Sequence, residues 1–140
     1  MASASFKVIV RDIKTQSAEG KLHEVAYGMM DTIRLILADD GAGFSVSDVT
    51  VKKPMDVVLQ YKHHIEANIF LEGGGSVENL TTGDVHEIRA GVTYIVFPQD
   101  RHRVKLAAGT RLICVFNPPL QGDENHDSDG GYDAPAAKPT

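Results

Sequence analysis

The stretch LEGGGSVENLTTGDVHEIRAGVTYIVFPQD, residues 71–100, decides the fold class of this chain. It places short runs rich in β-branched residues, such as SVENL (76–80) and VTYIVF (92–97), between turn sequences. The turns are GGG at 73–75, TTGD at 81–84, RAG at 89–91 and PQD at 98–100. Short strands separated by such turns are typical of β-sandwiches and small barrels.

The same alternation extends over most of the chain. Further runs of this kind are KVIVRDI (7–13), DTIRLIL (31–37), FSVSDVTV (44–51), DVVLQY (56–61), HRVKL (102–106) and RLICVF (111–116). Within residues 31–37, Thr32 and Arg34 fall on the face opposite to Ile33 and Leu35. We therefore expect an all-β domain of roughly eight or nine short strands, with a helical turn or two only within residues 18–30.

Composition restricts the function. The 140 residues, of which 42% are hydrophobic, suffice for one buried core. The net charge of −5 and the scattered basic residues argue against a nucleic-acid surface. We see neither a long apolar span nor a secretory signal, and a single cysteine, Cys114, fits a reducing compartment, so we expect a cytoplasmic protein without a membrane segment. We interpret Cys114 as a buried filler rather than a nucleophile.

The stretch YKHHIEANIF, residues 61–70, carries metal-capable side chains inside an apparent strand. Interpreted as one strand, it places His63, Ile65, Ala67, Ile69 and Leu71 on one face and His64, Glu66, Asn68 and Phe70 on the other. The first face is apolar enough to pack against a second sheet or another subunit. If the second face is buried, its carboxylate needs a cation, a hydrogen-bond network or water, whereas an exposed face needs none of these.

Two later residues favour a metal. Tyr94 lies in the middle of the strand GVTYIVF (91–97), and His102 opens the strand after a turn. Oxygen and nitrogen donors from Glu, Tyr and His suit iron or another first-row divalent ion better than a metal that prefers thiolates. The spacing alone is a weak signal.

Several phrases together resemble the ectoine synthase family, small cupins that close the ring of the compatible solute ectoine. They are LADDGAGFS (37–45), YKHHIEA (61–67), LEGGGSVENLTTGDVHEIRAGVTY (71–94), DRHRV (100–104), CVFNPPLQG (114–122) and ENHDSDGGY (124–132). The resemblance covers residues 8–133. It implies a small jelly-roll-like cupin β-barrel over residues 1–120 and a C-terminal lid over 121–134. Composition predicts a disordered tail over 135–140 with or without that lid. A wholly disordered acidic tail from Gln121 is the simpler interpretation of composition alone.

The resemblance also implies the site. Its metal is Fe(II), held by Glu66, Tyr94 and His102, so both histidines at 63 and 64 are non-ligands and His64 supports the site. Its substrate is a small molecule, and its expected assembly is a homodimer. Arg34, Tyr61, Phe116, Glu124 and His126 match the positions that contact substrate in the family, and of these we expect Tyr61, Glu124 and His126 to be catalytic. We expect Arg34, Phe116 and Thr50, which is next to the position of a family threonine, to bind substrate. Since Tyr61 and Glu66 differ in parity along one strand, a shared cavity would require a bulge or twist.

Three positions depart from the family pattern. Met30 stands in place of a pocket tryptophan, Val49 in place of a threonine (with Thr50 beside it), and Asn68 where an aliphatic residue is expected. Ectoine synthesis is therefore one hypothesis. A related metal-dependent cupin enzyme acting on another small zwitterion is the second, and a non-catalytic small-molecule-binding cupin is the third. Arg34 as a surface residue, and Tyr61 and Phe116 as plain core aromatics, also remain open.

Overall fold

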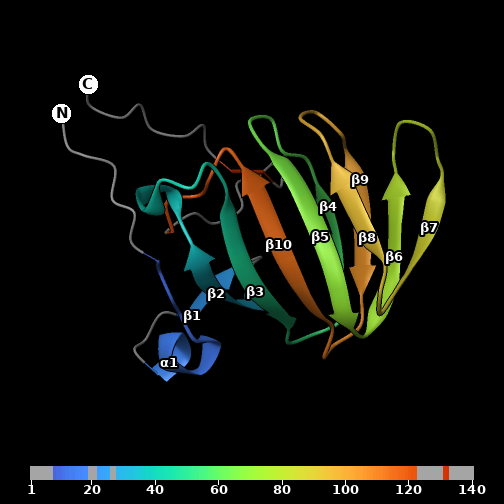
Figure 1. The fold of residues 1–140 in the computed structure, drawn as a ribbon. Helices are drawn as coiled ribbons and strands as arrows, with labels where there is room; N and C mark the ends of the chain where they lie inside the picture. Colours follow the sequence, from blue (N-terminus) through green and yellow to red (C-terminus); the bar gives the residue numbers. More distant parts are fainter. Residues whose placement is uncertain (1–7, 19–21, 26–27, 123–130, 133–140) are drawn as a thin grey trace.

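The computed structural model of the chain describes residues 8–18, 22–25, 28–122 and 131–132. Two antiparallel sheets face each other (Figure 1). The larger sheet has the order β1-β2-β3-β10-β5-β8, with β1 (Leu22–Val25), β2 (Met30–Ile36), β3 (Ser45–Val51), β10 (Arg111–Asn117), β5 (Ile65–Glu72) and β8 (Thr93–Val96). The smaller has the order β4-β9-β6-β7, with β4 (Met55–Leu59), β9 (His102–Leu106), β6 (Gly74–Asn79) and β7 (Val85–Arg89).

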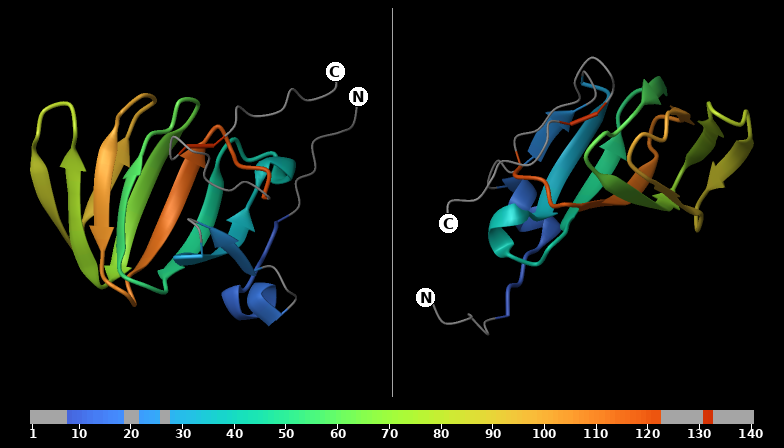
Figure 2. Two further views of the ribbon diagram at one scale, coloured as in Figure 1. Left: turned by 180° about the vertical axis from the view of Figure 1, so that it is seen from behind. Right: turned by 90° about the horizontal axis from the view of Figure 1, so that it is seen from above.

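The two sheets form the layers of a sandwich that opens toward its edges, as the view from above shows (Figure 2). Each sheet keeps its own hydrogen-bonded strand order, so the architecture is a jelly-roll-like sandwich rather than a continuously bonded barrel. The predicted all-β class is confirmed. The described residues contain no helix that is both long and apolar enough to cross a membrane.

The N-terminal region differs from the prediction. The expected strand at residues 7–13 is wrong: residues 8–12 form no strand, and α1 (Ile13–Ala18) follows them. The side chain of Asp12 accepts hydrogen bonds from the backbone N–H groups of Lys14 at 2.8 Å and Thr15 at 3.1 Å. This cap satisfies the first free donors of the helix, which outweighs the β propensity of the preceding residues. Most of the helix therefore lies before residues 18–30, where a helical turn was expected and β1 forms instead.

The core lies between the sheets, and β5 is oriented opposite to one expectation. Glu66, Asn68 and Phe70 point inward and are buried, whereas Ile69 and Leu71 are 37% and 43% exposed on the outer face. Of the two partners considered for the apolar face, the second sheet of this domain is therefore wrong, and another subunit stays a prediction. The face of β5 that carries Glu66 and Asn68 is the one directed at the second sheet, so this carboxylate and this amide lie inside the protein.

Candidate active site

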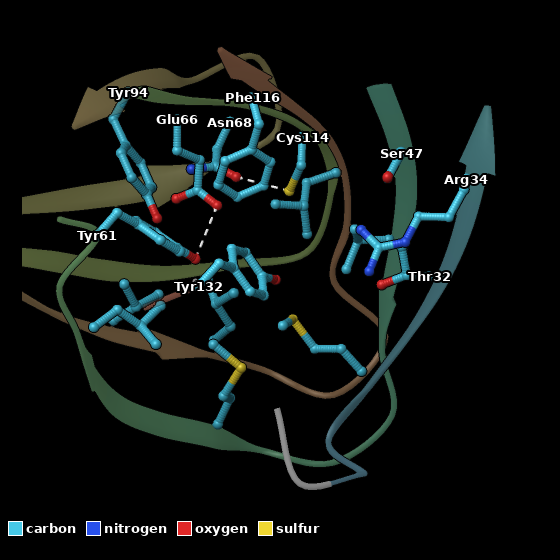
Figure 3. A pocket seen from close by; sticks show the side chains of 17 residues that line it. Thr32, Arg34, Ser47, Tyr61, Glu66, Asn68, Tyr94, Cys114, Phe116 and Tyr132 are labelled. Carbon is cyan, nitrogen blue, oxygen red and sulfur yellow. Dashed lines mark hydrogen bonds between the residues drawn. The ribbon is translucent and has the colours of Figure 1, made fainter. Parts of the chain in front are cut away.

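A cavity of about 40 Å³ lies between the inner faces of the two sheets. Most of its wall is apolar, including Met30, Val49, Met55, Leu59, Val104, Leu106, Leu112 and Phe116. Its polar side chains are Thr32, Arg34, Ser47, Tyr61, Glu66, Asn68, Tyr94, Cys114 and Tyr132 (Figure 3). A mostly apolar cavity with a few convergent polar groups is the usual form of a small-molecule site.

Glu66 and two tyrosines meet at one end of the cavity (Figure 3). The Tyr61 hydroxyl donates a hydrogen bond to Glu66 Oε2 at 3.2 Å. Tyr94 on β8 stands in register with Asn68 on β5, so it is a diagonal neighbour of Glu66 on the same inward face. The predicted bulge is unnecessary, because β5 begins at Ile65 and Tyr61 lies in the connection before it, where strand parity does not apply.

His102 opens β9 in the facing sheet beside this end of the cavity. Its side chain is 2% exposed, and its ring centroid lies 6.3 Å from that of Tyr94 and 6.3 Å from that of Tyr61. His102 Nδ1 lies 3.1 Å from the backbone carbonyl oxygen of Asp100. A carbonyl only accepts, so this contact places the proton on Nδ1 and leaves Nε2 with a lone pair. Nε2 is buried and has no hydrogen-bond partner among the described residues.

Burial dominates the electrostatics of this corner. It raises the pKa of the Glu66 carboxyl to about 7, although the neighbouring Asn68 amide and Tyr61 hydroxyl act in the opposite direction. Burial also raises the pKa of the Tyr61 and Tyr94 hydroxyls and lowers that of the His102 imidazole. Every one of these shifts disfavours an isolated charge, and a divalent cation among the groups would compensate for that cost.

These residues fit a metal ion. The orphaned Nε2 of His102, the buried carboxylate of Glu66 and the Tyr94 hydroxyl supply one nitrogen and two kinds of oxygen donor. No set of three His, Cys, Asp or Glu side chains in the described ranges could hold a metal, so a site here depends on the tyrosine. Oxygen and nitrogen donors of this kind suit first-row divalent ions.

Arg34 lies on a different wall of the same cavity. It projects from β2, is 7% exposed, and stands in register with Ser47 on β3 (Figure 3). Thr32 precedes it on the same inward face. The cavity therefore has a guanidinium with two hydroxyls on one side and the Glu66–Tyr94 corner on the other. Arg34 is not a surface residue.

A cluster of rings covers the cavity near Tyr61. The ring centroids of Phe116 and Tyr132 lie 5.2 Å and 5.3 Å from that of Tyr61. His64, which is buried, packs edge-on against Phe116 at 5.8 Å and Tyr132 at 6.1 Å. Its place behind these rings fits the supporting role that the resemblance implied, and His63 is exposed. A Cβ on Gly131 would collide with the carbonyl oxygen of Gln60, so Tyr132 reaches this position only because a glycine precedes it.

Not every predicted residue reaches the cavity. Thr50 is exposed, and Val49 beside it lines the wall, so the structure gives no support to Thr50 as a substrate-binding residue. Glu124 and His126 lie outside the described residues. The sequence analysis missed Thr32 and Ser47, which also line the cavity. Thr32 has the same strand parity as Arg34, and Ser47 the same as Val49, so parity was the signal that could have found them. Cys114 is buried as expected, and its thiol also donates a hydrogen bond to Asn68 Oδ1.

Comparisons with known proteins place this geometry in a family. A profile of ectoine synthase matches residues 8–136. The chain belongs to the ectoine synthase family. The L-ectoine synthase of Mycolicibacterium vanbaalenii is 41% identical over 120 residues, which cover 86% of this chain and 92% of that protein. The crystal structure of ectoine synthase from P. lautus superposes with a TM-score of 0.74 at 30% identity, covering 82% of this chain and 81% of that one.

A more distant solved structure agrees with the fold of the ectoine synthase family. An RmlC-like cupin from Shewanella frigidimarina superposes with a TM-score of 0.56 at 21% identity, over 68% of this chain and 81% of that one, which shows the fold alone. The predicted cupin architecture is thus confirmed. As a member of the ectoine synthase family, the chain is an enzyme of the hydro-lyase class, so the hypothesis of a non-catalytic binding cupin is set aside.

Proposed function

We propose that the chain is an L-ectoine synthase, which converts N-γ-acetyl-L-2,4-diaminobutyrate into ectoine by intramolecular condensation with loss of water. One observation carries this proposal: a mostly apolar cavity, in a member of the ectoine synthase family, holds Arg34 on one wall and the Glu66–Tyr94 corner on another. The substrate has the matching parts, a carboxylate at one end and an acetamide carbonyl at the other.

Arg34 binds the substrate carboxylate in this proposal. The buried guanidinium lines the cavity, and its planar fork pairs well with a carboxylate through two parallel hydrogen bonds. The hydroxyls of Thr32 and Ser47 lie on the same side of the cavity and suit the remaining acceptor positions. Anchoring this end folds the flexible substrate so that its α-amine approaches the carbonyl carbon, and such proximity lowers the barrier of ring closure.

Ring closure requires proton transfer. The neutral α-amine attacks the carbonyl carbon and forms the new C–N bond; the carbon–oxygen bond then breaks, and the oxygen leaves as water with the two protons of the amine. Burial keeps the Tyr61 hydroxyl protonated. In this proposal its proton, which is hydrogen-bonded to Glu66 Oε2 without substrate, turns toward the departing oxygen once substrate is bound. Glu124 and His126 are its proposed partners in this transfer. Phe116 and Tyr132 exclude bulk water from the cavity.

Glu66, Tyr94 and His102 are the proposed ligands of Fe(II) or another first-row divalent ion. When bound, such an ion supplies a Lewis acid that makes the acetamide carbonyl more electrophilic. What this chain contributes is the donor set: a carboxylate held by Tyr61, a phenol oxygen, and an imidazole whose Nδ1 proton is fixed by the Asp100 carbonyl.

A second candidate has a specific observation in its favour. Met30, Val49 and Asn68, the three positions that depart from the family pattern, all line the cavity. They change the surface that the substrate contacts without replacing a proposed metal ligand. A related metal-dependent cupin enzyme that acts on a different small zwitterion is therefore the alternative.

We further propose that the enzyme is a cytoplasmic homodimer. The outer face of the larger sheet exposes Ile69 and Leu71 on β5 and Ile95 on β8, with Phe97 directly after β8. These side chains form an apolar area that a second copy would cover. The free thiol of Cys114 suits a reducing compartment. Sedimentation equilibrium tests the assembly: Ile95→Lys is expected to yield a monomer, and a wild-type monomer at micromolar concentration would contradict it.

The function is tested with purified, Fe(II)-loaded protein and the acetylated diaminobutyrate, with ectoine measured by NMR. Turnover is expected, and Glu66→Ala and His102→Ala are expected to lose both turnover and bound iron. The outer-face variant Leu71→Ala is the matched control and retains both. A protein that binds iron without producing ectoine would favour the alternative substrate, and one that binds no metal would overturn the metal assignment.

A further inference from the structure

Asn68 lies at a point that the proposed reaction does not use. It is 2% exposed and points inward from β5, two residues after Glu66. In the strand register it faces Cys114 of β10 on one side and Tyr94 of β8 on the other. Its amide therefore lies between a thiol and the corner where the proposed metal ligands meet (Figure 3).

One end of this amide is already bonded. The Cys114 thiol donates a hydrogen bond to Asn68 Oδ1 at 2.9 Å. Burial raises the pKa of this thiol well above its usual value, so the sulfur carries its proton and acts as the donor. With Oδ1 engaged by Cys114, the Nδ2 end of the amide faces Glu66 (Figure 3).

The other end is directed at the carboxylate. Asn68 Nδ2 is buried and meets no described partner with full hydrogen-bond geometry, although the amide lies close enough to Glu66 to lower the pKa of its carboxyl. The reversed amide would set Oδ1 against the carboxylate oxygens, and two acceptors repel each other. On the other side of the carboxylate, the Tyr61 hydroxyl holds Oε2. Glu66 thus lies between two donors.

We propose that Asn68 is a positioning residue, whose amide, oriented by the Cys114 thiol, holds the Glu66 carboxylate in place for a divalent metal ion. This inference rests on the metal part of the proposed function. Residues that orient a metal ligand contribute to affinity without touching the ion, and their loss weakens binding by about 10- to 100-fold. The order of action is Cys114, then Asn68, then Glu66.

The test is the Co(II) affinity of the metal-free protein, measured by competition with a chelator, together with the visible spectrum of the Co(II) protein. Asn68→Leu is expected to bind Co(II) about tenfold or more weakly, with a shifted spectrum. Cys114→Ala shifts both in the same direction, and Cys114→Ser stays near wild type because its hydroxyl also donates to Oδ1. Because the two residues act in sequence, the double variant Asn68→Leu/Cys114→Ala loses no more than Asn68→Leu alone.

Two controls separate this effect from general damage. Ser47→Ala changes a buried hydroxyl on the Arg34 side of the same cavity and should leave Co(II) affinity unchanged. Asn68→Ala repeats the test with a side chain that fits without overpacking, and thermal unfolding establishes that each variant is folded. Wild-type affinity and spectrum in both Asn68 variants would overturn the proposal, and additive losses would remove Cys114 from it. A wild-type protein that binds no Co(II) would overturn it together with the metal assignment, which distinguishes the two failures.

Discussion

The two faces of the larger sheet differ in a way that reverses the usual rule. The inner face carries Arg34, Glu66 and Asn68 among its buried side chains, whereas the outer face exposes Ile69 and Ile95. Burying a polar group costs free energy unless the group is hydrogen-bonded or paired, and an exposed apolar side chain contributes no burial free energy to folding. The buried polar residues line the candidate site, and the exposed apolar residues form the surface that we propose a second copy covers.

The largest effect is expected where the inner face packs. Phe70 is buried and stacks on Tyr94 with the ring centroids 5.8 Å apart, so Phe70→Ala should destabilise the protein by about 3–5 kcal/mol. Ile69→Ala, one residue away on the outer face, should cost less than about 1.5 kcal/mol. Urea denaturation measures both changes, each combined with the metal-free Ile95→Lys variant, which is expected to be monomeric. Equal losses at the two positions would break the comparison between the faces.

The buried carboxylate should make metal-free stability depend on pH. The folded pKa of Glu66, about 7, lies above its ordinary value of 4.5, so the folded state binds this proton more tightly than the unfolded state. The associated stability is fully present below about pH 4.5 and is lost as the pH rises to about 7, a change of about 3 kcal/mol. The measured quantity is the wild-type free energy of unfolding minus that of Glu66→Gln, which lacks this group. A difference that stays flat between these pH values would contradict the burial effect.

A smaller effect is expected at the cationic wall. Arg34→Lys keeps the charge but loses the planar fork, so KM should rise by about tenfold while kcat changes less. Arg103→Lys is the matched control, because Arg103 lies on the outer face of the smaller sheet, paired with Asp56 at 2.7 Å. Steady-state kinetics with the proposed substrate measures both. An unchanged KM in Arg34→Lys would remove the carboxylate from this wall.

The smallest effect concerns two neighbours on β3 that face opposite ways. Thr50→Val, on the outer face, should leave KM and kcat within about twofold of wild type. Val49→Thr adds a hydroxyl to the cavity wall and should change KM by about 2- to 10-fold. A larger response at Thr50 than at Val49 would mean that the register of β3 relative to the cavity is wrong.

Strand alternation and turn residues predicted most of the fold, because a period of two and glycine-rich reversals are local properties of the chain. The failures have physical reasons. At residues 7–13 a single capping side chain, Asp12, overrode the β propensity. In YKHHIEANIF the alternation showed two faces, but deciding which one is buried depends on what the other sheet presents, and that is a non-local property.

The site was predictable only in part. Glu66, Tyr94 and Arg34 line the cavity, as strand parity and the family resemblance together predict. The Cys114–Asn68 bond could not be anticipated, since these residues are far apart in sequence and meet only through the register of β10 and β5. Thr50 is next to Val49, the position of the family's threonine, but Val49 shares strand parity with Ser47 and is the one that lines the cavity.

The close approach of Gly131 to Gln60 bears on how the cavity wall can be changed. Tyr132 forms part of the cavity wall but belongs to no strand of either sheet, so its replacement alters the shape of the pocket without removing a ladder of backbone hydrogen bonds. Gly131 is required for this placement of Tyr132, because any side chain at position 131 would push this part of the wall away from Gln60. Replacing Tyr132 is therefore expected to change the contacts made with substrate while the hydrogen-bonded strands of both sheets stay intact.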